Sequence, residues 1–242
     1  MFLESIIDIN VNPFEELSAS ANFEPVTKGR MGAVIVDPKD KLIPIVRTTT
    51  IYQNSATSFL PIHYAIIEKI KAKFNHLNLQ FNNALVEIYD NNYRNMGYHS
   101  DQALDLDDDS YICLYSCYDN PTHIRSLKVQ QKGVPDIADI KLNHNSIVLF
   151  STFTNRQYLH KIVLESSQST NKWLGITFRL SKTYIQFIDD KPYFSNNVPL
   201  TLASADERKQ FYKCRGQENA NTDYVYAEIN YTISASDTKP IV

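Results

Sequence analysis

A row of short β-rich segments, separated by turn-forming residues, is the feature that most constrains the fold of this chain. The segments are rich in Val, Ile, Leu, Tyr and Phe, which are typical of strands. Evenly spaced short strands predict a sandwich or barrel. They are "NALVEIY" (83–89), "YICLYSC" (111–117), "HIRSLKV" (123–129), "SIVLFST" (146–152), "YLHKIVL" (158–164) and "WLGITFRL" (173–180). We therefore expect a mostly β fold with flanking helices.

Upstream of this row, the sequence predicts an irregular stretch over residues 1–30, and then two short strands at 32–37 and 43–47. A helix follows in "SFLPIHYAIIEKIKAKF" (58–74). Thr57 or Ser58 is its expected cap, Pro61 suits its first turn, and apolar residues recur every four positions. His63, in the first turn, is expected on the surface.

Downstream of the row, "SADERKQFYKCRG" (204–216) predicts a helix capped by Ser204 and ended by Gly216. The alternation in "TDYVYAEINYTIS" (222–234) predicts a strand, and residues 235–242 are expected to be loose. We expect one domain over residues 1–185, with its core at about 82–182 and an N-terminal lid and helix in 1–81. Residues 186–242 would be a helix–strand extension packed on that domain.

The charge and cysteine content narrow the class of protein. The formal net charge is −3, so the chain lacks the overall basic field of a strong nonspecific nucleic-acid binder. Its three cysteines have no zinc-type spacing, which favours a reducing compartment. The first residues have no basic leader, and no apolar run has membrane-spanning length. We expect a cytoplasmic protein without a membrane partner.

Three residues have the chemistry of a metal site. In "GYHSD" (97–101), His99 and Asp101 are two positions apart and share a face if the backbone is extended. His160 lies in the middle of an apolar strand, where an imidazole needs a hydrogen bond or a metal. Two imidazoles and one carboxylate form the facial triad of non-haem Fe(II) oxygenases, which leaves positions open for a cosubstrate and O₂.

A fourth residue points to an anionic ligand. Arg179 stands inside the apolar segment "ITFRLS" (176–181), where an uncompensated guanidinium is costly. A dicarboxylate cosubstrate would provide its partner, because Arg binds carboxylate through two parallel hydrogen bonds. The alternative is that His99 lies in a solvated loop, His160 is satisfied in the core and Arg179 pairs with an internal acid. That alternative needs three separate coincidences.

In this order, "EIYDNNYRNMGYHSD" (87–101), His160 and "ITFRLS" (176–181) resemble the Fe(II)/2-oxoglutarate-dependent dioxygenase superfamily. The closer similarity is to its AlkB-like branch, with N-x-Y, H-x-D, a distal His and [LI]-T-F-R. The resemblance covers about residues 82–182. It is weaker over 30–81, where "PIVRTTTIYQ" (44–53) is similar to a substrate-lid segment.

The resemblance implies a double-stranded β-helix (jelly roll) with Fe(II) at one open end. His99, Asp101 and His160 would be the metal ligands and catalytic residues. Tyr89 and Arg179 would bind 2-oxoglutarate, and Ser181 would share the carboxylate held by Arg179. The implied reaction uses 2-oxoglutarate and O₂ for the oxidative demethylation or hydroxylation of an alkylated nucleobase in DNA or RNA.

Two positions depart from the pattern of the branch. Glu87 stands where the branch has Asn, and it would repel an anionic cosubstrate unless it is paired or protonated. Trp173 stands where the branch has a further Arg. We therefore expect Arg179 to be the one cosubstrate arginine, with Trp173 as an apolar wall of the site.

The substrate stays open at this stage. "DLDDDS" (105–110) predicts a solvated acidic loop rather than a calcium site, since it lacks the glycine and distal Glu of an EF-hand. A loop of this charge near the triad disfavours phosphate. The alternatives are a hydroxylase or demethylase of a protein side chain or small metabolite, and a non-catalytic jelly-roll binding module.

Overall fold

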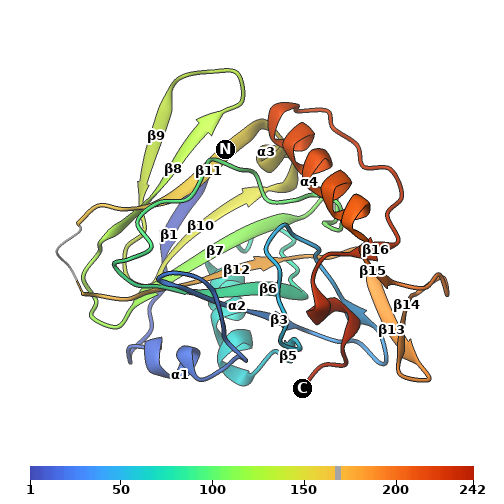
Figure 1. Ribbon diagram of the computed structural model, residues 1–242. Coiled ribbons are helices and arrows are strands. Elements are labelled where there is room, and N and C mark those ends of the chain that lie inside the picture. Colours follow the sequence, from blue (N-terminus) through green and yellow to red (C-terminus); the bar gives the residue numbers. More distant parts are fainter. Residues whose placement is uncertain (167–169) are drawn as a thin grey trace.

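The computed structural model describes residues 1–166 and 170–242, and its architecture is set by two antiparallel sheets (Figure 1). Its strands are β1 (Leu3–Ile6), β2 (Glu24–Thr27), β3 (Arg30–Val36), β4 (Ile43–Pro44), β5 (Thr57–Ser58), β6 (Asn83–Tyr89), β7 (Tyr111–Tyr118), β8 (Arg125–Gln131), β9 (Ile137–Lys141), β10 (Ser146–Ser151), β11 (Tyr158–Leu164), β12 (Trp173–Arg179), β13 (Tyr184–Ile188), β14 (Lys191–Phe194), β15 (Thr201–Leu202) and β16 (Tyr231–Thr232). Its helices are α1 (Phe14–Ser18), α2 (Pro61–Lys73), α3 (Thr152–Gln157), α4 (Ala205–Ala220) and the 3₁₀ turn η1 (Ala235–Thr238).

The pairing of the strands is that of a jelly roll. The major sheet runs β1-β10-β7-β12-β6-β3-β2, with the short β5 paired to β3, and the minor sheet runs β11-β8-β9. From β6 to β12 the chain passes back and forth between the two sheets, so that β6 pairs with β12 and β7 lies between β10 and β12. The predicted double-stranded β-helix with flanking helices is confirmed.

The major sheet is buried on both faces, which explains why its strands are almost continuously apolar. One face packs on α2 through Ile66, Ile67 and Ile70. The other face packs on the minor sheet, with Phe150 of β10 in the same cluster as Ile162 of β11. Figure 1 shows α2 and the β8–β9 hairpin on opposite sides of this sheet. Burying each such side chain contributes about 1.5–3 kcal/mol, so α2 and the minor sheet fix the major sheet between them.

Two expectations for the α2 region are wrong. Thr57 and Ser58 pair as β5 with β3, so the helix begins later, with Leu60 before its first residue Pro61. His63 is fully buried rather than exposed. Its Nδ1 accepts a hydrogen bond from the Leu60 amide (2.9 Å) and its Nε2 lies 3.0 Å from Ser20 Oγ. The imidazole thus caps the helix, a role that Leu60 lacks the polar atoms to fill.

The chain termini are more ordered than the sequence predicts. Residues 1–30 contain β1 at the edge of the major sheet, α1 and β2. Helix α4 begins after Ser204 as expected, but it continues through Gly216 to Ala220. Only Tyr231–Thr232 of the expected 222–234 strand pairs, with β15, and the tail forms η1.

The continuation of α4 has a physical reason. Glycine inside a helix costs about 1 kcal/mol relative to alanine. Arg215 and Glu218, on either side of Gly216, are both buried against the rest of the chain, and their contacts offset that cost. In the described part of the chain, no helix has the length and apolar character needed to cross a membrane.

Candidate metal centre

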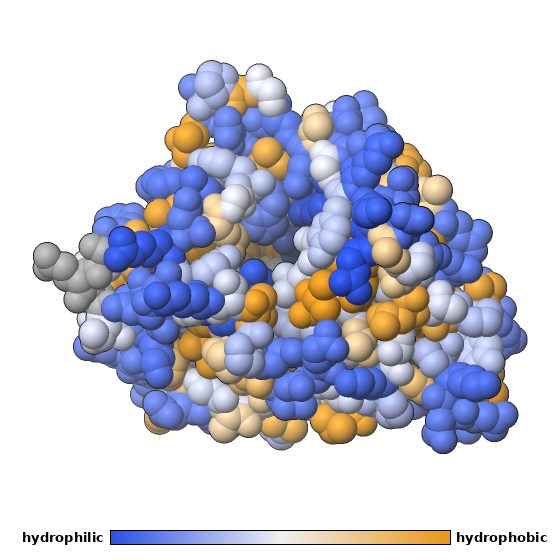
Figure 2. Space-filling view, in the orientation of Figure 1, coloured by the Kyte–Doolittle hydropathy of each residue, from blue (hydrophilic) through white to orange (hydrophobic). Residues whose placement is uncertain are grey.

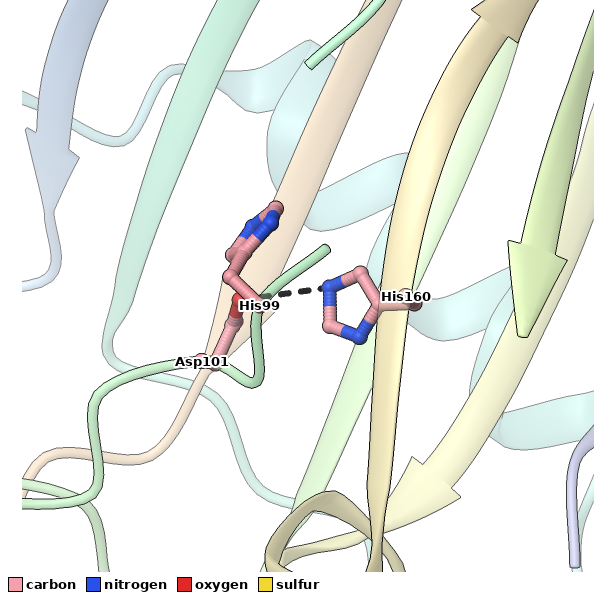
Figure 3. Close-up of side chains that lie close together, drawn as sticks. All are labelled: His99, Asp101 and His160. Atoms are coloured by element: carbon pink, nitrogen blue, oxygen red, sulfur yellow. Dashed lines mark ion pairs between the residues drawn. The ribbon is translucent and has the colours of Figure 1, made fainter. Parts of the chain in front are cut away.

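The structure brings His99, Asp101 and His160 together in one cluster. One possible ligand atom from each residue lies within 4.8 Å of the others, and no other such group of His, Cys, Asp or Glu occurs among residues 1–166 and 170–242. Figure 3 shows the three side chains close together, with the dashed line joining Asp101 and His160. Asp101 Oδ1 lies 3.7 Å from His160 Nε2.

Backbone pairing sets this geometry. His99 and His160 form an antiparallel bridge in which each amide donates to the other's carbonyl, at 3.0 and 2.7 Å. Asn95 forms a second antiparallel bridge with Val163, and the Leu164 amide donates to the Arg94 carbonyl (2.8 Å), so residues 94–99 run beside β11. The distal histidine is therefore held directly opposite the His-x-Asp pair, with the two imidazole centroids 4.7 Å apart.

The protonation states suit metal binding. Burial, together with the nearby His160 and Arg215, lowers the pKa of His99 to about 3. Its Nδ1 lies 3.0 Å from the Gly97 carbonyl, which can only accept, so Nδ1 carries the proton and Nε2 keeps its lone pair. Burial acts to raise the pKa of Asp101, but His160 and Arg179 outweigh it and hold that pKa below its ordinary value.

The three side chains also include a buried oxygen atom that lacks a hydrogen bond within residues 1–166 and 170–242, as expected of a site that binds a divalent metal. Asp101 Oδ2 is buried and has no hydrogen-bond partner among the described residues. A buried carboxylate oxygen without a hydrogen bond is costly, and a directly bound cation would remove that cost. Two neutral imidazoles and one carboxylate are the ligands of the Fe(II) facial triad.

A cavity of about 340 Å³ opens beside the triad, and its lining includes all three residues together with Arg179. Figure 2 shows the surface hollowed between the β8–β9 hairpin and α4. Arg179 is almost fully buried, and burial lowers its pKa. Its Nη1 lies 4.0 Å from Asp101 Oδ2 and its Nη2 lies 3.4 Å from Asn83 Oδ1. Its Nε has no partner in the described part of the chain.

Two of the residues expected to bind cosubstrate lie behind the cavity wall. The Tyr89 hydroxyl donates to Glu87 Oε2 (2.7 Å), and its ring packs on Trp173. Ser181 Oγ donates to the Ile45 carbonyl (2.5 Å) and lies 3.0 Å from the Thr183 carbonyl. Neither is among the residues that line the cavity.

Glu87, which would repel an anionic cosubstrate if it were unpaired, has a cationic partner in the structure. Its carboxylate faces the cavity and forms an ion pair with Arg30, whose Nε donates to Oε1 at 2.7 Å. Arg30 also lines the cavity, and the sequence analysis missed it. It lies opposite Tyr89 in the β3–β6 register, a contact between positions 59 residues apart that only the strand pairing reveals.

The expectation that Trp173 forms a wall of the site is wrong. Its indole is 1% exposed and lies within the core formed by the two sheets, away from the cavity lining. It covers Gly175, where a Cβ atom would lie 2.0 Å from the indole ring. Because Gly175 has no side chain, the Trp173 indole can pack directly over its backbone.

Comparisons with known proteins return similarities of fold at low sequence identity. OsALKBH1 is 13% identical over 70% of this chain and 88% of its own, with a TM-score of 0.48. An oxidoreductase of the 2OG-Fe(II) oxygenase family from Burkholderia pseudomallei is 13% identical over 68% of this chain and 74% of its own, with a TM-score of 0.43. No protein-family model and no curated protein matches the chain.

Proposed function

We propose that this protein is an Fe(II)- and 2-oxoglutarate-dependent dioxygenase that demethylates or hydroxylates an alkylated nucleobase in DNA or RNA. The observation that carries the proposal is the convergence of His99, Asp101 and His160 on the wall of a cavity that also contains the buried Arg179. The His–Asp–His cluster alone, or the buried Arg179 alone, could serve only to stabilise the fold. Together they provide a cation site and an anion site in one cavity.

Each residue has a distinct role in this proposal. His99, Asp101 and His160 would hold the iron, and its charge would balance that of the Asp101 carboxylate, whose Oδ2 lies 4.0 Å from Arg179 Nη1. Arg179 is then free to bind a cosubstrate carboxylate. Bound iron and 2-oxoglutarate supply the oxidation, in which O₂ is consumed, 2-oxoglutarate becomes succinate and CO₂, and one oxygen atom enters a substrate C–H bond.

Apolar side chains from both sheets limit water in the cavity. They come from β6, β7, β8, β10 and β11, and they are Leu85, Leu114, Leu127, Phe150 and Ile162. This apolar part of the lining strengthens the attraction between Arg179 and a carboxylate. It also keeps water away from the reacting atoms.

Two features support a nucleobase substrate. Tyr93 and Met96 precede His99 in the chain and line the cavity. The aromatic ring of Tyr93 can stack on a base. The acidic loop at 105–110 is also less repulsive than its sequence predicts. Asp105 pairs with the buried Arg47, and Asp108 pairs with Arg156 and Lys182.

The net charge of −3 favours a second candidate, the hydroxylation or demethylation of a protein side chain or small metabolite. A substrate panel separates the two. The Fe(II)-loaded protein is incubated with 2-oxoglutarate, O₂ and N-methylated DNA and RNA oligonucleotides, and product bases and formaldehyde are measured. An Asp101→Ala variant controls for free iron.

We expect demethylation that needs 2-oxoglutarate and is absent from the variant. Succinate formation without any change in the oligonucleotides would contradict the nucleobase assignment and favour the second candidate. A non-catalytic module would form no succinate in excess of the Asp101→Ala control.

A further inference from the structure

The metal-binding tripeptide His99-Ser100-Asp101 has every backbone polar group hydrogen-bonded. The amide and carbonyl of His99 pair with His160 on β11. The amide and carbonyl of Asp101 bond to Oδ1 and Nδ2 of Asn155 on α3, both at 2.7 Å. The groups of Ser100, between the two ligands, bond to a third element, α4.

Helix α4 binds Ser100 through two side chains. Asn219 Oδ1 accepts from the Ser100 amide (3.1 Å) and lies 3.2 Å from its hydroxyl. Arg215 donates through Nη2 to the Ser100 carbonyl, and its Nη1 lies 3.4 Å from the hydroxyl. Ser100 is fully buried, so water cannot replace these partners without a rearrangement of the helix.

A further set of contacts holds these side chains in place. Glu218 accepts from Arg215 Nη1 (2.5 Å), from the Tyr226 hydroxyl (2.7 Å) and from the Ala103 amide (2.8 Å). Its carboxylate therefore neutralises the buried guanidinium and also fixes the chain just beyond Asp101. At the end of α4, Lys132 donates to the Glu218 and Asn221 carbonyls, where a cation suits the helix dipole.

We propose that α4 is part of the metal centre, with Arg215, Glu218 and Asn219 as positioning residues for the ligand loop. None of the three is a ligand. They hold Ser100 so that His99 and Asp101, on either side of it, stay aimed at one point. This inference rests on the proposed function, which identifies the site as a metal centre. It assigns α4, in the C-terminal residues 186–242, a role in that centre.

The expected effect follows from the general behaviour of metal sites. Residues that orient ligands typically change metal affinity by about 10- to 100-fold when they are removed. Asn219 is the best position to test, because one oxygen makes both of its contacts with Ser100. Asn219→Ala removes that oxygen, whereas Asn219→Asp keeps it. Gln217→Ala is the matched control, since it removes an exposed side-chain amide from the same helix.

The experiment titrates Co(II) into the full-length, metal-free proteins and records the dissociation constant and the visible absorption of the bound ion. Unfolding of each metal-free variant by urea shows whether the fold is intact. We expect Asn219→Ala to bind Co(II) at least about tenfold more weakly than wild type, with an altered spectrum. Asn219→Asp should restore both properties, and Gln217→Ala should match wild type.

Wild-type affinity and spectrum in Asn219→Ala would overturn the positioning role and leave the proposed function intact. The same would follow if Gln217→Ala weakened binding as much as Asn219→Ala. Absence of Co(II) binding by the wild-type protein would instead contradict the metal centre itself, and this inference with it.

Discussion

Arg30 and Glu87 form an ion pair inside the cavity, between neighbouring strands of the major sheet. Arg30 Nε donates to one carboxylate oxygen of Glu87, and the Tyr89 hydroxyl donates to the other. Burial opposes the charge of Arg30, but the pair with Glu87 raises the pKa of Arg30 above its ordinary value. This part of the cavity is therefore neutral, and its cation is not available to a ligand.

Replacing Glu87 with Gln should tighten 2-oxoglutarate binding. The change removes a negative charge that faces the cosubstrate and releases Arg30 to bind a carboxylate. We expect the dissociation constant, measured calorimetrically with Mn(II) in place of iron, to fall about tenfold, or ~1.4 kcal/mol. Glu68→Gln, on the exposed face of α2, should leave it unchanged. Weaker binding by Glu87→Gln would show that the carboxylate serves the cosubstrate directly.

The buried pair of Arg47 and Asp105 should be a large contributor to stability. Asp105 accepts from the Arg47 amide and from its guanidinium, which also donates to the Ile229 and Tyr231 carbonyls. Asp105→Asn removes the carboxylate that is hydrogen-bonded to this buried guanidinium, and we expect a loss of about 3–5 kcal/mol in the free energy of unfolding. Asp108→Asn is the control, because Asp108 pairs with Arg156 and Lys182 at the surface, where such pairs contribute about 0–1 kcal/mol. Equal losses for the two variants, measured by urea unfolding, would refute this difference.

Gly175 should not tolerate a side chain. A Cβ atom there would lie 2.0 Å from the ring of the buried Trp173, and overpacking of a core typically costs about 1–3 kcal/mol. Gly216→Ala is the opposite case, since nothing lies within 4 Å of the added atom and the position is helical. We expect Gly175→Ala to lower the free energy of unfolding and the thermal midpoint, and Gly216→Ala to raise the free energy of unfolding by about 0.5–1 kcal/mol. A neutral Gly175→Ala would mean that the indole can move.

The metal-free protein should lose stability as the pH falls through the range set by His63. Burial lowers the pKa of His63 from 6.5 to about 4, so the unfolded chain binds the proton first. Stability from this group is complete above about pH 6.5 and is lost as the pH falls toward 4, by up to ~3 kcal/mol. Urea unfolding of wild type and His63→Ala between pH 7 and 4 tests this. The variant should be less stable at pH 7 and show a smaller decrease, and parallel curves would contradict the assignment.

The strands of the jelly roll could be predicted because their residues carry the information locally. The expected segments at 83–89 and 158–164 coincide with β6 and β11. Strand β9 was missed because it is an exposed edge with little apolar periodicity, and α3 because it is a short turn between two strands. The register of the strands could not be read from the sequence, since it depends on pairing between distant segments.

The same distinction applies to the site. The residue types and order of His99, Asp101, His160 and Arg179 were sufficient to single them out. Arg30, Asn155 and Asn219 reach the site through tertiary contacts, and no local pattern distinguishes them from surface residues. For His63, the local sequence pattern led to a wrong prediction. Its position in the first turn predicted exposure, but it is buried because Ser20 and Leu60 satisfy its ring.

The most direct test of the central claim is the anaerobic addition of Fe(II) and 2-oxoglutarate to the metal-free protein, followed by visible absorption. Wild type, Arg179→Ala and a control, Arg156→Ala, at a partly exposed arginine outside the cavity lining, are compared at the same concentrations. A weak visible band that forms in wild type and Arg156→Ala, and is lost or needs far more 2-oxoglutarate in Arg179→Ala, is the predicted result. Iron binding by wild type with no band at saturating 2-oxoglutarate would contradict the assignment of this cavity to that cosubstrate.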